Sequence, residues 1–158
     1  TGHSDRLTFN NTRSVKVHGL EAEAEQRWAG GRRLRVAYAW QKARDPSIAT
    51  ELINSPRHLL KVQWSDVLHL PADWGWPSGR YAVEAIGIGP RSTVRGTRLP
   101  GHVLTNATYT TRVADVDVSV GVYNLFNRQH ADPASFEIRE DTVRQDGRTY
   151  RIKLTYAF

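Results

Sequence analysis

Three glutamates at alternating positions, Glu21, Glu23 and Glu25, have the spacing of carboxylates that could act together in acid–base catalysis. On an extended strand all three would share one face. Arg33 and Arg35 follow on the next predicted strand, and opposite charges facing each other across paired strands explain the glutamates more simply. Serine, histidine and aspartate also occur, but no motif places them together as in a hydrolase. The sequence therefore predicts no enzyme and no catalytic residue.

The histidines do not have the spacing of a metal site. No H-x-x-x-H or H-E-x-x-H pattern occurs, and the chain has no cysteine, which also removes disulfides. We therefore predict no metal site and no cofactor. Two histidines, at positions 58 and 102, fall close to long connections, which leaves haem ligation by them open. The histidines are His3, His18, His58, His69, His102 and His130.

A third candidate site is the basic connection 91–101, which holds Arg91, Arg95 and Arg98. Guanidinium groups this close together could attract an anionic ligand or a phosphate. A solvated basic loop without any ligand explains the same residues at least as well. Both interpretations stay open.

Composition narrows the class of protein. The 158 residues include 22 Lys plus Arg and 16 Asp plus Glu, which gives a formal charge of +6 and a pI near 10. The basic residues are spread along the chain and interrupted by acids, so no nucleic-acid partner is predicted. No apolar run approaches the roughly 18 residues of a membrane-spanning helix. The polar N-terminus begins without Met and without a signal peptide, which indicates a piece of a longer polypeptide.

The elements that must position these residues are strands, because apolar and polar residues alternate with a period of two. Residues 150–158 and 116–122 show the alternation most cleanly. Two strands are less regular: Leu104 falls on the opposite side from Val103, and the pattern changes phase between Val83 and Ile86, which predicts a bulge. A partial strand at 6–10 could precede the others. The predicted strands are 14–28, 32–44, 57–69, 79–89, 102–112, 115–126 and 147–158.

The connections alternate between short turns and long loops. Such strands and connections are typical of outer-membrane barrels, in which the apolar face meets lipid and the polar face lines the lumen. Aromatic residues near strand ends, such as Trp28, Trp40 and Tyr150, fit the interfacial girdles of these barrels. The prediction is an all-β, antiparallel transmembrane β-barrel segment of about seven or eight up-and-down strands. A soluble β-sandwich or lipocalin-like barrel has the same alternation with the apolar face inward, and the pattern alone leaves it open.

Several motifs, in order, resemble the C-terminal part of the β-barrel of a TonB-dependent outer-membrane receptor. Each motif is weak alone, but together they cover nearly the whole chain. The last strand ends on Phe158, as in this family, where the terminal aromatic serves as a signal to the barrel-assembly machinery. The matching segments are V-x-G-x-E-x-E at 17–23, YAW at 38–40, N-x-P-x-H at 54–58, NLFN at 124–127 and QDGRTY at 145–150.

The resemblance implies that residues 1–158 are the C-terminal portion of a barrel of about 22 strands. The plug domain, TonB box and signal peptide would be absent from this chain. Connections 45–56, 91–101 and 127–146 would be external, and the turns periplasmic. The implied function is active transport of a ferric siderophore or similar bulky nutrient, energised by TonB. Lipid, lipopolysaccharide, the TonB complex and the assembly machinery are the implied partners. A small outer-membrane barrel that closes on itself is the alternative.

Overall fold

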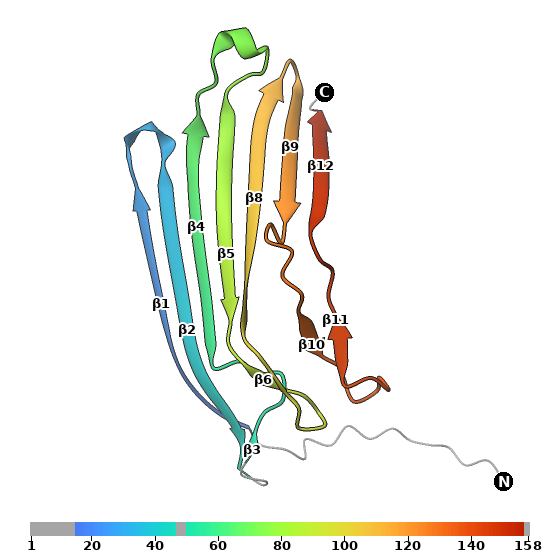
Figure 1. Ribbon diagram of the computed structural model, residues 1–158. Helices are drawn as coiled ribbons and strands as arrows, with labels where there is room; N and C mark the ends of the chain where they lie inside the picture. The colour runs from blue at the N-terminus through green and yellow to red at the C-terminus, as the bar shows by residue number, and fades with distance from the viewer. Residues whose placement is uncertain (1–14, 47–49, 157–158) are drawn as a thin grey trace, which may run out of the picture.

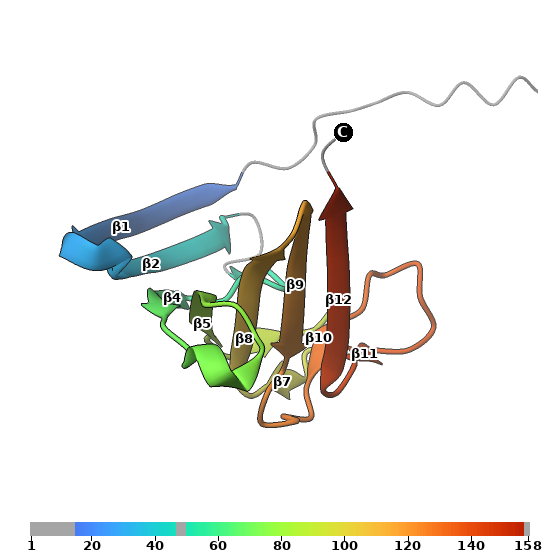
Figure 2. The same cartoon turned by 90° about the horizontal axis from the view of Figure 1, so that it is seen from above.

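The computed structural model describes residues 15–46 and 50–156, which form one antiparallel sheet (Figure 1). Each long strand pairs with the next long strand along the chain, as the sequence predicts. The sheet does not close: Figure 2 shows β1 and β12 at opposite ends of a curved arc. The long strands, in sheet order, are β1 (Lys16–Arg27), β2 (Arg33–Asp45), β4 (His58–Leu68), β5 (Gly79–Ile88), β8 (His102–Val113), β9 (Val116–Tyr123) and β12 (Thr149–Tyr156).

The two ends of the sheet differ in their connections. The turn end carries the short connections 28–32, 69–78 and 114–115, and the loop end carries the long connections 46–57, 89–101 and 124–148. No helix in the described residues is long and apolar enough to cross a membrane. The predicted strand 6–10 and Phe158 lie outside the described residues. The short elements are β3 (Thr50–Glu51), β6 (Arg91–Ser92), β7 (Arg98–Leu99), β10 (Ala131–Pro133), β11 (Thr142–Arg144), η1 (Ala29–Gly31) and η2 (Ala72–Trp74).

The register places apolar and polar side chains on separate faces. Leu34 pairs with Trp64 and Val36 with Val62 on one face, which we call the apolar face. The intervening residues form the polar face. The apolar face is open, since Leu20 retains 65% and Ile152 71% of its accessible surface. The sheet therefore has no core of its own on this face, and something outside the described residues must cover it.

Strand β5 corrects one prediction. The ladders from β5 to β4 and to β8 run without interruption through all residues of β5, so the predicted bulge between Val83 and Ile86 is wrong. The phase change has another cause: Ile86 lies on the polar face, where it faces Lys61 on one side and Leu104 on the other. The prediction that Leu104 lies opposite to Val103 is confirmed.

Strand β9 ends at Tyr123, three residues before the predicted boundary. Asn124 has a φ of 52°, and the N–H of Asn127 donates to the Asn124 carbonyl at 2.8 Å, which closes a turn. Asparagine tolerates this left-handed conformation better than most residues. The NLFN segment therefore ends the strand and starts the connection to β12.

Aromatic residues gather at the turn end of the apolar face. The rings of Trp28 and Trp64 lie 5.8 Å apart, and the indole N–H of Trp64 donates to the Tyr81 hydroxyl at 3.1 Å. Arg32 lies over the Trp64 ring and pairs with Asp66 at 2.8 Å. The one cation of this group is therefore neutralised within the sheet.

Gly79 and Gly87 on the same face of β5 provide a matched test of the packing. A Cβ at Gly79 would lie 2.5 Å from the Thr110 carbonyl oxygen, whereas one at Gly87 would meet its nearest atom, the Leu60 Cβ, at 3.6 Å. We expect Gly79→Ala to lower the free energy of unfolding by about 1–3 kcal/mol because the backbone must shift. Gly87→Ala should leave it nearly unchanged. Urea unfolding in detergent measures both, and equal losses would contradict the close approach.

Candidate functional site

Three carboxylates on the polar face, Glu23, Glu25 and Glu84, are paired with cations of neighbouring strands, whereas Glu21 faces Ala39. Both carboxylate oxygens of Glu23 accept from Arg35 at 2.9 Å, and Glu25 accepts from Arg33. Glu84 accepts from Lys61, as an ion pair at 2.8 Å. The prediction that Arg33 and Arg35 face the glutamates across the strands is confirmed. These groups stabilise the sheet and leave no free acid–base pair among Glu23, Glu25 and their partners.

Arg91 joins the three long connections at the loop end. Its guanidinium donates to Asp132 at 2.6 Å and to the side-chain oxygen of Asn54 at 3.3 Å. The Asn54 N–H also donates to the Ser92 carbonyl at 2.9 Å. The Arg91 side chain is only 8% exposed. A buried charge of this kind needs its partner, so Arg91 holds connections 46–57 and 124–148 against 89–101.

Asp141 makes a second attachment between connections 89–101 and 124–148. Its carboxylate accepts from the Thr93 hydroxyl at 2.8 Å and from the Arg95 N–H at 3.2 Å. The Arg95 guanidinium donates to the Arg139 carbonyl at 2.7 Å. Burial raises the pKa of Asp141, but the hydrogen bonds from Thr97, Thr93 and Arg95 and the Arg95 charge outweigh it and hold the pKa below its usual value.

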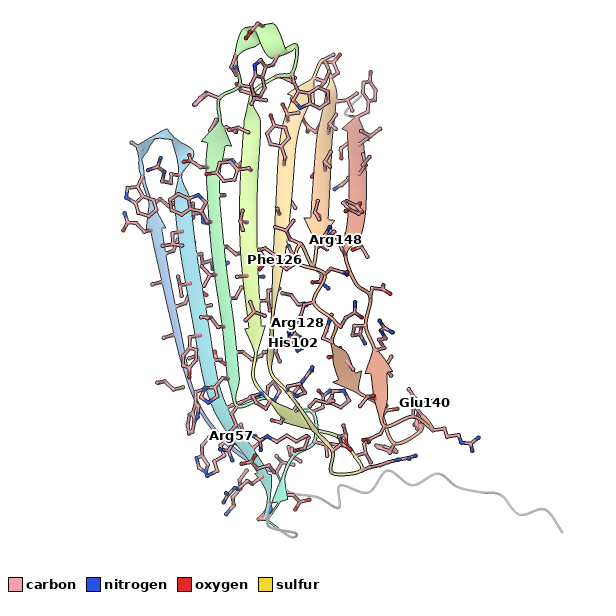
Figure 3. All side chains as sticks on the ribbon, viewed as in Figure 1. Arg57, His102, Phe126, Arg128, Glu140 and Arg148 are labelled. Atoms are coloured by element: carbon pink, nitrogen blue, oxygen red, sulfur yellow. The ribbon has the colours of Figure 1, made fainter. Side chains whose placement is uncertain are left out.

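A pocket of about 220 Å³ opens between connections 46–57 and 89–101. Arg57, labelled in Figure 3, pairs with Glu51, and this hydrogen bond lowers the pKa of Glu51. Arg98 has no side-chain partner in the described part of the chain. The pocket is therefore lined by more positive than negative charge. Its lining residues are Glu51, Leu52, Ser55, Arg57, His58, Pro90, Arg91, Ser92 and Arg98.

The structure separates the three arginines of the predicted basic site. Arg91 and Arg98 line the pocket, whereas the backbone N–H of Arg95 donates to Asp141 of connection 124–148. Asp132 and Asp141 were missed, because no motif marks a carboxylate that pairs with a residue about forty positions away. The ligand role of the three arginines stays a prediction.

Two histidines meet at the loop end. The rings of His102 and His130 lie 4.6 Å apart, and His102 is buried. His58 is elsewhere, where its Nδ1 lies 2.7 Å from the Tyr38 hydroxyl. Among residues 15–46 and 50–156 no group of three or more histidine or acidic side chains could hold a metal ion.

A scan against protein-family models matches residues 1–125 to the TonB dependent receptor-like, beta-barrel family. The chain belongs to this family. It is a family of outer-membrane transporters rather than of enzymes. A search of curated proteins found no significant match. In a segment of a TonB-dependent receptor barrel, the long connections between strands are the natural candidates for ligand contact.

The Arg91–Asp132 pair gives a prediction about how the connections are joined. Asp132→Ala leaves a buried guanidinium without its carboxylate, a loss of about 1–3 kcal/mol, so the contact between connections should loosen. We expect protection of the Asn54 amide against hydrogen exchange to fall at least about tenfold, while the long strands stay protected. Asp146→Ala, an exposed residue in the same connection, is the control. Unchanged protection at Asn54 would show that Arg91 does not hold the connections together.

Asp141 makes the second attachment sensitive to acid. Because its pKa is lower in the folded than in the unfolded chain, its contribution is present above the unfolded value and is lost as pH falls through the folded value. Protection of the Arg95 amide, corrected for intrinsic exchange, should be constant from neutral pH down to about 4 and should then fall. Asp141→Asn should give weak protection at every pH. Protection that persists at pH 2 would contradict the role of the charge.

Proposed function

We propose that this chain contributes barrel wall and three external loops to an active-transport receptor in the outer membrane of a Gram-negative bacterium. The cargo is a ferric siderophore or a similar bulky nutrient, and TonB energises its uptake. The chain would be the C-terminal portion of a barrel of about 22 strands. The family match supports the assignment as a receptor. The pocket beside Arg98 is the observation that supports an anionic cargo.

The sheet edges support a larger barrel. In the described residues, β1 pairs only with β2, and β12 only with β9. In lipid, each unpaired backbone group along these edges would cost several kcal/mol, so both strands need neighbours. Further strands on each side would supply them. A plug and a TonB box would lie in the same missing part of the protein.

The pocket supports an anionic cargo. Ferric chelates with carboxylate or catecholate ligands are anions, and Arg98 offers a guanidinium that no carboxylate neutralises within the described residues. Arg91 shapes the pocket wall, while its charge is shared with Asp132. We therefore narrow the predicted site of three arginines to Arg98 as the residue that contacts the ligand. Arg95 lies nearer the tip of the same connection.

The partners follow from the place of such a receptor. Membrane lipid and lipopolysaccharide would surround the apolar face, and the TonB complex would act through the missing N-terminal part. The last strand, which ends on Phe158, would be read by the barrel-assembly machinery. Nucleic acid is not among the partners.

Replacement of Arg98 tests the cargo. In cells that depend on the complete receptor, Arg98→Ala should lower the affinity for a ferric siderophore about tenfold or more, the worth of one charge-assisted hydrogen bond. Uptake of a radiolabelled panel of ferric siderophores, haem and cobalamin measures this. Arg139→Ala removes the same charge from the tip of connection 124–148 and should have no effect. If no cargo in the panel is taken up, or if both variants transport like the wild type, the proposal fails.

A further inference from the structure

Two histidines at the loop end lie against each other inside a group of charged side chains. His102 begins β8 and retains 9% of its accessible surface, and its ring centre lies 4.6 Å from that of His130 in connection 124–148. Arg91, Arg128 and Asp132 interact electrostatically with His102. Figure 3 shows Arg128 beside His102 at the loop end. We call His102 and His130 the histidine pair.

The surroundings of the histidine pair are cationic even while both rings are neutral. The Arg91 side chain is only 8% exposed, and Asp132 is its ion-pair partner. Arg128 takes part in none of the ion pairs found among the described residues. The group therefore holds two guanidinium groups and one carboxylate before either ring gains a proton.

The other elements packed around the histidine pair present neutral or basic side chains to this end of the sheet. Strand β5 places Ile88 opposite His102 in the ladder. His58 of β4 lines the same groove as His102. Arg144 of β11 donates to the side-chain oxygen of Gln129. None of these side chains would offset a further positive charge on the histidine pair.

The turn that ends β9 fixes the position of His130. The Arg128 carbonyl accepts from the Asn124 side chain at 2.9 Å and lies 3.2 Å from Nδ1 of His130. Because a carbonyl oxygen only accepts, Nδ1 carries the hydrogen, and Nε2 is the nitrogen that gains a proton in acid. The His130 carbonyl also accepts from the Gln145 N–H at 3.1 Å. The ring therefore cannot move far from His102 without the loss of these bonds.

We propose that the histidine pair is a pH-sensitive switch in the attachment between the long connections. While both rings are uncharged, Arg91 stays with Asp132. A proton on either ring adds a cation beside Arg91, and like charges repel strongly where water is excluded. Arg91 is the group that gives way, because β8 and the turn at Asn124 hold the two rings. Its release frees Asn54 and loosens the wall of the pocket beside Arg98.

The pH range separates this switch from the attachment made by Asp141. Histidine is the side chain that ordinarily changes charge between about pH 5 and 8. The closed arrangement binds fewer protons than the loosened one, so it is favoured as pH rises and weakened as pH falls through this range. Asp141 keeps its bonds to Thr93 and Arg95 down to about pH 4. Acid therefore acts on the loop end in two steps, first at Arg91 and then at Asp141.

The test follows the Asn54 amide in the full-length receptor, in detergent and without any cargo. Its protection against hydrogen exchange, corrected for intrinsic exchange, should fall at least about fivefold between about pH 7.5 and pH 5 in the wild type. His102→Gln/His130→Gln removes both titrating rings and should change less than about twofold over this range. His130→Gln alone replaces only the less buried ring and should give a smaller response than the wild type. The Arg95 amide, held by Asp141, should stay equally protected in every variant.

His58→Gln is the matched control, since it removes a histidine at the same end of the sheet whose ring is bonded to Tyr38 and lies outside the pair. It should keep the full response, and a heat-shift of the band on gels confirms that each variant is folded. Constant wild-type protection at Asn54, or an equal fall in His130→Gln, overturns the inference. The switch rests on the proposed function only for the external position of the connections. A receptor that shows the pH response without any siderophore uptake would contradict the cargo proposal alone.

Discussion

The fold depends on one constraint: the antiparallel ladder must keep its register across every strand pair. Side chains alternate with a period of two, so a slip of one residue would move a whole strand's apolar set to the polar face. From β1 to β12 the pairings run without a bulge, and two clean faces result. The paired charges of Glu23 and Arg35 on the polar face, and the aromatic group around Trp64 on the other, exist only because this register holds.

The same period explains why the sheet was predictable from the sequence. Five of the seven long strands show the alternation directly, and the glutamates of β1 predict their arginine partners on β2. The error at β5 shows where the pattern misleads. Ile86 and Leu104 are apolar residues on the polar face, and they face each other across the ladder. An apolar pair on the wrong face looks like a bulge in one strand, because the partner strand that explains it is not visible in the local pattern.

For the loop end, the sequence predicts only its location in the fold and not its contacts. Connection lengths indicate where the loops gather, but not which residues join them. Arg91 meets Asp132, and Thr93 meets Asp141, across separations that no periodicity spans. The prediction grouped Arg91, Arg95 and Arg98 because they are neighbours in sequence. The structure assigns them different surroundings: one is buried in an ion pair, one bonds to a carbonyl, and one is open to the pocket.

The cations of the sheet and its connections differ in whether a carboxylate lies beside them. On the polar face, Arg35 and Lys61 lie beside carboxylates of adjacent strands, as Arg32 does at the turn end of the apolar face. At the loop end, Arg98 and Lys42 form no ion pair within the described residues, and they face different surroundings. Arg98 opens into a pocket between connections, where a soluble anion can enter. Lys42 lies on the apolar face, where the register pairs it with His18. The register of β2 therefore decides which of its cations lie on the apolar face and which lie on the polar face.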